Sequence, residues 1–161
     1  MKTLVLGMGN PILSDDGVGL IVARAMENSV EGVDVVTTEL VGLHVMEMLL
    51  GYDKVFLIDA ATTGGKPVGF LQKLEEGTGG LHLFTSHGLN FPELLQLGKE
   101  MGYKMPEVGA IYGIEIVDEA VFGERLSPEL AEKLDSIIEA IREDITAILS
   151  ECASEDGATP I

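Results

Sequence analysis

Cysteine, basic residues and long apolar runs are scarce in this chain of 161 residues, and each scarcity excludes a class of protein. The single cysteine, Cys152, has no partner for an internal disulfide, so we expect a reducing compartment, the cytoplasm. No run of about 18 apolar residues occurs, so we expect no membrane-spanning helix. The apolar run that ends at Gly7 is too short for a signal-peptide core, so we expect no signal peptide.

Basic residues are outnumbered by acidic ones, with 10 Lys and Arg against 27 Asp and Glu, which gives a formal net charge of −17. Such a negative field repels phosphate backbones, so nucleic acid is not an expected partner. A cationic surface or a metal ion suits the charge better, although a solvated acidic surface accounts for most of it. The length fits one domain of ordinary globular composition.

Short apolar runs of strand length alternate with amphipathic helical stretches along the chain. We expect strands at 3–6, 33–38, 54–59, 68–74 and 109–116, and helices at 16–28, 41–50, 87–101 and 128–149. Alternation with short links predicts an α/β fold: one three-layer domain with a twisted, mainly parallel five-stranded sheet and helices on both faces. We assign this domain to residues 1–150 and expect the small, polar residues 151–161 to form a disordered tail.

Several common catalytic motifs are missing. Gly7 and Gly9 begin like a dinucleotide fingerprint, but the third glycine position holds Ile12 and no basic residue stands nearby to meet a phosphate. The simplest interpretation of the two glycines is a turn that ends the first strand. The chain also has no Gly-x-Ser-x-Gly elbow and no histidine pair at the helical spacing of zincins.

Three residues at the end of an expected strand or at the start of an expected helix could form a metal site. One of Asp15 and Asp16 is expected to cap the first helix, which leaves the other carboxylate free. Asp59 ends a buried strand, where a carboxylate needs hydrogen bonds or a cation. His87 stands at the start of an expected helix, whose dipole keeps the imidazole neutral and able to bind a metal. Each residue also has a structural interpretation, in capping or in loop hydrogen bonds.

Asp16, Asp59 and His87 together indicate a metal site more specifically than any one of them does alone. If the first and third strands are neighbours, as in the flavodoxin-like order, Asp16 and Asp59 converge where the strand order reverses. His87 can reach the same point from the next crossover. One imidazole and two carboxylates suit a divalent metal such as nickel, zinc or iron.

The same residues lie in motifs that resemble those of the hydrogenase maturation proteases. Residues 4–19, LVLGMGNPILSDDGVG, resemble the opening motif of that family. Residues 57–60 resemble the second motif, and residues 86–89 resemble the third. Residues 112–115 and 126–128 are also typical of the family, so the resemblance extends over residues 3–149.

The resemblance implies an aspartic-type, metal-binding endopeptidase, which removes the C-terminal extension of a nickel–iron hydrogenase large-subunit precursor after nickel insertion. Its metal-contacting positions match Asp16, Asp59 and His87, and the metal would be nickel carried by the substrate. No catalytic residue is assigned. Further residues that could line the site are Asn10, Asp15 and Glu39. Glu39 stands where many members carry an Asp-Gly-Gly turn, and its carboxylate is a candidate replacement for that acid.

Two other functions fit the same residues. One is a self-contained metallopeptidase with a permanent zinc ion, and the other is a non-catalytic nickel or assembly chaperone for the same precursor. The expected partner is the hydrogenase large-subunit precursor, with neither nucleic acid nor a membrane involved. No coiled-coil seam favours assembly, so we expect a monomer.

Overall fold

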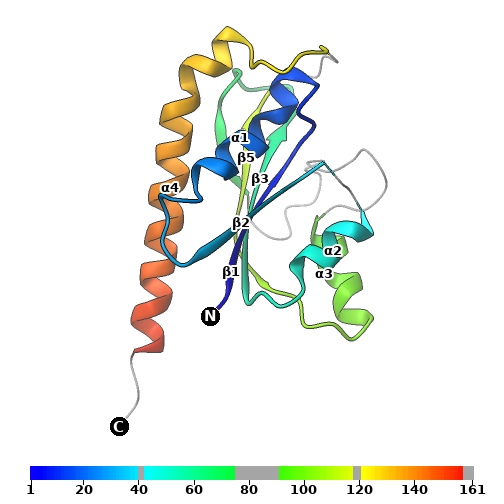
Figure 1. Ribbon diagram of the computed structural model, residues 1–161, viewed down its shortest axis with the longest axis vertical. Helices are drawn as coiled ribbons and strands as arrows, with labels where there is room; N and C mark the ends of the chain where they lie inside the picture. Colours follow the sequence, from blue (N-terminus) through cyan, green and yellow to red (C-terminus); the bar gives the residue numbers. More distant parts are fainter. Residues whose placement is uncertain (40–41, 75–90, 118–120, 158–161) are drawn as a thin grey trace.

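One five-stranded sheet organises residues 1–39, 42–74, 91–117 and 121–157, which are the residues that the computed structural model describes (Figure 1). The strands are β1 (Thr3–Met8), β2 (Val33–Thr38), β3 (Lys54–Ala61), β4 (Leu71–Leu74) and β5 (Glu107–Glu115). Their order is β2-β1-β3-β5-β4, and all pairs are parallel except the β4–β5 pair. The predicted mainly parallel sheet is therefore confirmed. The predicted edge strand at 68–74 is shorter than expected, because Val68 and Gly69 form a turn before it, closed by a hydrogen bond from the Phe70 N–H to the Pro67 carbonyl at 3.0 Å.

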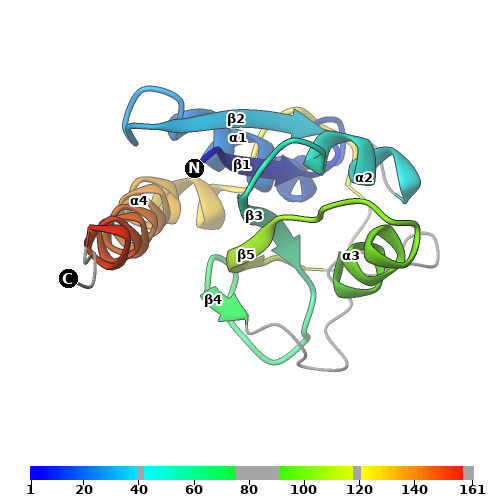
Figure 2. The same ribbon diagram turned by 90° about the horizontal axis from the view of Figure 1, so that it is seen from below.

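Helices cover both faces of this sheet, as predicted. They are the short 3-10 helix η1 (Ser14–Gly17), α1 (Val18–Ala25), α2 (Leu43–Leu49), α3 (Phe91–Glu100) and α4 (Pro128–Asp156). Figures 1 and 2 show α1 and α4 on one side of the sheet and α2 and α3 on the other. None of these helices is both long enough and apolar enough to cross a membrane.

The side chains of the central strand β3 belong to two hydrophobic cores, one on each face of the sheet. Phe56 and Ile58 pack with the residues of α1 and α4, whereas Val55 and Leu57 pack with those of α2 and α3. All four side chains are fully buried. A strand covered on both faces reads as a continuous apolar run, which is why the sequence of β3 shows no alternation.

Helix α4 begins where the sequence predicts and ends later. The Ser127 Oγ accepts a hydrogen bond from the Leu130 N–H at 3.3 Å, and Pro128 follows the cap, as expected for a helix start. The helix continues to Asp156, so the predicted disordered tail is wrong for residues 151–156. The buried Lys54 Nζ lies 3.0 Å from the Cys152 Sγ, which gives the last turns a tertiary contact. Residues 158–161 lie outside the described residues.

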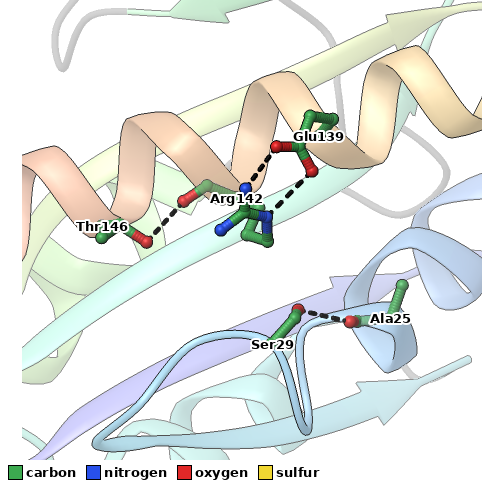
Figure 3. Close-up of polar contacts among 5 residues, drawn as sticks. All are labelled: Ala25, Ser29, Glu139, Arg142 and Thr146. Atoms are coloured by element: carbon green, nitrogen blue, oxygen red, sulfur yellow. Dashed lines mark hydrogen bonds and ion pairs between the residues drawn. The ribbon is translucent and has the colours of Figure 1, made fainter.

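Exposed polar side chains of α4 and of the turn that follows α1 are satisfied locally (Figure 3). Arg142 donates from Nε to the Glu139 carboxylate at 2.9 Å, and the Thr146 hydroxyl donates to the Arg142 carbonyl at 2.8 Å. The Ser29 hydroxyl donates to the Ala25 carbonyl at 2.7 Å. Contacts of this kind on an exposed helix contribute little to stability, and they explain these polar groups without a functional role.

Candidate functional site

The carboxyl ends of β1 and β3 lie side by side where the strand order reverses, at the top of the sheet in Figure 1. The chain leaves β1 toward β2 on one side and later returns to β3 on the other. In open α/β sheets this switch point is where ligands bind. Asp16 in η1 follows β1, and Asp59 lies near the end of β3. The predicted neighbourhood of the first and third strands is therefore confirmed.

A glycine lets the start of α1 approach both strand ends. A Cβ atom on Gly19 would lie 2.3 Å from the Met8 carbonyl oxygen and 2.7 Å from the Ile58 carbonyl oxygen. No side chain tolerates such distances to backbone atoms. The backbone at the helix start therefore packs directly on β1 and β3, and this packing holds Asp16 near Asp59.

Gly7 and Gly9 serve the same close packing. A Cβ atom on Gly7 would lie 2.4 Å from the Ala23 Cβ, and one on Gly9 would lie 2.4 Å from the Asp16 carbonyl oxygen. Gly7 is a residue of β1 itself, so its interpretation as part of a strand-ending turn is wrong. The glycines are required because a helix packs on the strand, and no phosphate is needed to explain them.

Asp16 is held from the loop that follows β1. Its Oδ2 accepts a hydrogen bond from the Asn10 N–H at 3.1 Å, and the Asn10 Oδ1 accepts one from the Ile12 N–H at 3.2 Å. Burial raises the pKa of Asp16, and the Asn10 N–H opposes that shift. The predicted capping role is wrong, because the residue at the N-cap of α1 is Gly17 and no side chain caps it.

Asp59 is buried, with 7% of its surface exposed. Its Oδ1 accepts a hydrogen bond from the Ala60 N–H at 2.8 Å. Burial raises the pKa of Asp59 well above its ordinary value; the Ala60 N–H opposes this shift, and the negative charge of Asp16 adds to it. The structure thus brings the two predicted carboxylates close enough to interact.

The Asp16–Asp59 pair is short of positive charge. Within the described part of the chain, no Lys or Arg forms an ion pair with either carboxylate. Each carboxylate has one oxygen bound to a backbone N–H, and its second oxygen accepts no hydrogen bond from a described residue. Burying a carboxylate without a cation is unfavourable. The donor set therefore fits a divalent cation, which would be bound by hard oxygen ligands.

Asp15 binds the start of α4. Its Oδ1 accepts a hydrogen bond from the Ser127 N–H at 2.7 Å, and its Oδ2 accepts one from the Ser127 hydroxyl at 2.7 Å. Asp15 therefore fastens η1 to the start of α4, and both of its oxygens are engaged. Glu39 is exposed just beyond the carboxyl end of β2, at the same edge of the sheet.

His87, the third predicted metal contact, lies outside the described residues, as does the predicted start of its helix. Among the residues that the structure does describe, no group of three or more His, Cys, Asp or Glu side chains could hold a metal ion. The structure therefore brings two of the three predicted contacts together, and the position of His87 stays a prediction.

Glu115 is a buried acid at this edge whose role the sequence did not reveal. It ends β5 beside Ala61 of β3, and 2% of its surface is exposed. Its carboxylate accepts hydrogen bonds from the N–H groups of Thr63 and Gly64 at 3.0 Å and from the Gln72 amide at 3.3 Å. Glu115 thus holds the segment after β3 in place. The available signal was an acid that ends an apolar strand, as Asp59 does.

Comparisons with known proteins point to one family. A family model described as hydrogenase maturation protease matches residues 21–144. The hydrogenase expression/formation protein HupD of Thiocapsa roseopersicina is 26% identical over 148 residues, and the match covers 86% of this chain and 65% of that protein. The chain thus spans less than two thirds of the length of this curated relative.

Solved structures share the fold. The hydrogenase maturating endopeptidase HybD from E. coli matches with a TM-score of 0.68 at 19% identity, over 88% of this chain and 90% of that chain. The [NiFe] hydrogenase maturation protease HycI from Thermococcus kodakarensis KOD1 matches with a TM-score of 0.65 at 20% identity, over 89% and 91% of the two chains. At these identities the likeness concerns the arrangement of strands and helices.

Proposed function

Because this chain belongs to the hydrogenase maturation protease family, we propose that it is an endopeptidase that removes the C-terminal extension of a hydrogenase large-subunit precursor. The observation that carries this proposal is the Asp16–Asp59 pair at the switch point of the sheet. A buried carboxylate beside a half-buried one, with no ion pair to a described Lys or Arg, is a costly arrangement, and carboxylates with pKa values raised in this way cluster at functional sites.

The precursor delivers the metal in this proposal. Asp16 and Asp59 each have one oxygen that accepts no hydrogen bond from a described residue and is proposed to bind nickel, and His87 is proposed as a nitrogen ligand. Three protein ligands leave coordination positions for groups of the precursor or for water. Nickel would then report that the precursor is loaded and would hold the cleavage site against the protease. A divalent cation also polarises a carbonyl or a water molecule.

A cleavage assay with two forms of the precursor tests this function. The purified protein is incubated with nickel-loaded and with nickel-free precursor, and the mass of the precursor is followed. We expect only the nickel-loaded form to be shortened. Equal cleavage of both forms would show an endopeptidase that does not sense nickel.

Two further outcomes would replace the proposal. A tightly bound, stoichiometric zinc ion in the purified protein would assign the carboxylate pair to a resident metal. Binding of the nickel-loaded precursor without any shortening would indicate a chaperone. Metal analysis and a binding measurement on the same preparation separate these outcomes from the proposed one.

A further inference from the structure

Three large apolar side chains are exposed on the two segments that adjoin η1, the short helix that carries Asp16. The exposed fractions are 52% for Ile12, 53% for Val121 and 80% for Phe122. These three residues are called the apolar rim below. Exposed apolar side chains that gather at one place on a protein of this size mark interaction surfaces, whereas isolated ones need no explanation.

The apolar rim is built from two distant segments that are hydrogen-bonded to each other. The Gly123 N–H donates to the Ile12 carbonyl at 2.9 Å, and the Ser14 N–H donates to the Gly123 carbonyl at 2.8 Å. These bonds form a parallel bridge between Leu13 and Gly123, which places Ile12 beside Phe122. In Figure 1 the segment before α4 crosses the top of the sheet beside the residues that follow β1.

Further contacts fix the loop that carries Ile12. The Ser14 hydroxyl donates to the Arg125 carbonyl at 2.7 Å, in addition to the backbone bridge. Ser14 itself has a φ of 49°, a left-handed conformation that costs a non-glycine residue free energy. The surrounding structure therefore imposes the path of this loop, and with it the outward position of Ile12.

The same loop holds Asp16, one of the two carboxylates of the candidate site. The Ile12 N–H donates to the Asn10 side chain, and the Asn10 N–H donates to Asp16. The apolar rim is thus continuous with the candidate site. A metal ion or a small molecule bound by the carboxylates would gain nothing from an exposed Phe and Ile on the adjoining segments, whereas a protein substrate is large enough to contact them.

We propose that the apolar rim is the surface on which the hydrogenase large-subunit precursor docks, through apolar residues of the precursor near its scissile segment. This inference rests on the proposed function. The protein has a net charge of −17, so an acidic partner surface would be repelled. The matching surface of the precursor is therefore apolar at its centre and neutral or basic around it. A few well-packed side chains near the centre of an interface carry most of its binding energy.

A substitution in the rim and a matched substitution elsewhere test the docking. Phe122→Ser removes the most exposed member, and Met101→Ser makes the same kind of change at a side chain that is 56% exposed, beyond α3 at the opposite end of the sheet. Both variants should melt like the wild type. For cleavage of nickel-loaded precursor, we expect Phe122→Ser to raise KM about tenfold. Its kcat should stay near that of the wild type, and Met101→Ser should change neither constant.

Direct titration of the enzyme with nickel-loaded precursor measures the dissociation constant and tests the docking without relying on cleavage. An equal dissociation constant for the wild type and Phe122→Ser would overturn the docking proposal, whether or not the protein cleaves. Tight binding that depends on Phe122, without cleavage by the wild type, would overturn the proposed endopeptidase function and keep the docking surface. Self-association of the wild type that Phe122→Ser abolishes would assign the rim to a second copy of this chain and overturn the proposal.

Discussion

Two aspartates mark the two ends of the central strand β3, and their surroundings are opposite. Asp53, just before the strand, accepts hydrogen bonds from the Lys2 N–H at 2.7 Å and from the Lys104 Nζ at 3.0 Å, and these partners lower its pKa. Asp59, at the other end, is buried beside Asp16, and its pKa is raised. The first aspartate is paired in a way that favours folding. The second has a desolvation cost that no ion pair with a described Lys or Arg offsets.

The largest expected effect is that of replacing Asp59 by Asn, and the same replacement at Asp53, before the other end of β3, serves as its control. Asp59→Asn should lower the cleavage of nickel-loaded precursor at least about 100-fold, because a carboxylate that is proposed to contact the metal should matter more than a residue that only supports a metal ligand. Asp16→Asn should have a similar effect. Asp53→Asn is the matched control and should cleave like the wild type, since its partners lie at the other end of the sheet. Wild-type cleavage by Asp59→Asn would remove the carboxylate pair from the mechanism.

His87→Ala extends the comparison to the third predicted contact. A neutral imidazole provides a nitrogen ligand that neither carboxylate replaces. We expect the variant to fold with less than about 1 kcal/mol of change in the free energy of unfolding, as for surface positions without a packing role. It should lose nearly all processing of nickel-loaded precursor. Thermal melts and precursor cleavage are measured together, and full cleavage by a folded variant would exclude His87 from the site.

Gly19→Ala tests whether close packing keeps the two carboxylates together. The added methyl group would meet the Met8 carbonyl oxygen at 2.3 Å, so the start of α1 would have to move away from the strands. We expect a loss of about 1–3 kcal/mol in the free energy of unfolding, together with weaker cleavage of the precursor. Gly65→Ala is the control, because its Cβ would meet no atom within 4 Å. Unchanged cleavage by a folded Gly19→Ala would show that the site tolerates this displacement.

The sequence predicted those features that depend on local patterns. Three such features are confirmed: the apolar run of β3, the helix start at Ser127-Pro128, and the alternation of strands with helices along the chain. Each follows from residues that are a few positions apart. The ends of adjacent strands then placed Asp16 and Asp59 together without any knowledge of side-chain contacts.

The errors arose where the partner lies far along the chain. Local rules gave one of the two aspartates at the start of η1 a capping role, but the partner of Asp15 is Ser127, 112 positions away. The late end of α4 depends on Cys152 and Lys54, which are 98 positions apart. Glu115 was missed for the same reason, because its partner Thr63 belongs to another segment.

The pH dependence of stability should differ in sign between the two ends of β3. The folded pKa of Asp59 is raised above the unfolded value of 3.8, so its contribution to stability is complete below that value and is lost as the pH rises through the folded pKa. The folded pKa of Asp53 is lowered, so its contribution is present above the unfolded value and is lost as the pH falls.

At neutral pH and without metal, Asp59→Asn should therefore be more stable than the wild type, and Asp53→Asn less stable. Urea unfolding of the three proteins from acidic to neutral pH measures both effects. A shift of the two variants in the same direction would contradict the opposite environments described for the two carboxylates.

The smallest expected effect lies at the end of α4. Truncation after Ser150 removes Cys152, the hydrogen-bond partner of Lys54, and leaves that buried amine with Glu107 at 4.0 Å. We expect a loss of about 1 kcal/mol in the free energy of unfolding and unchanged cleavage, because this contact lies where β3 begins. Truncation after Asp156 keeps the contact and should change neither property. A folded protein truncated after Ser150 that no longer cleaves the precursor would place the C-terminal residues in the docking surface.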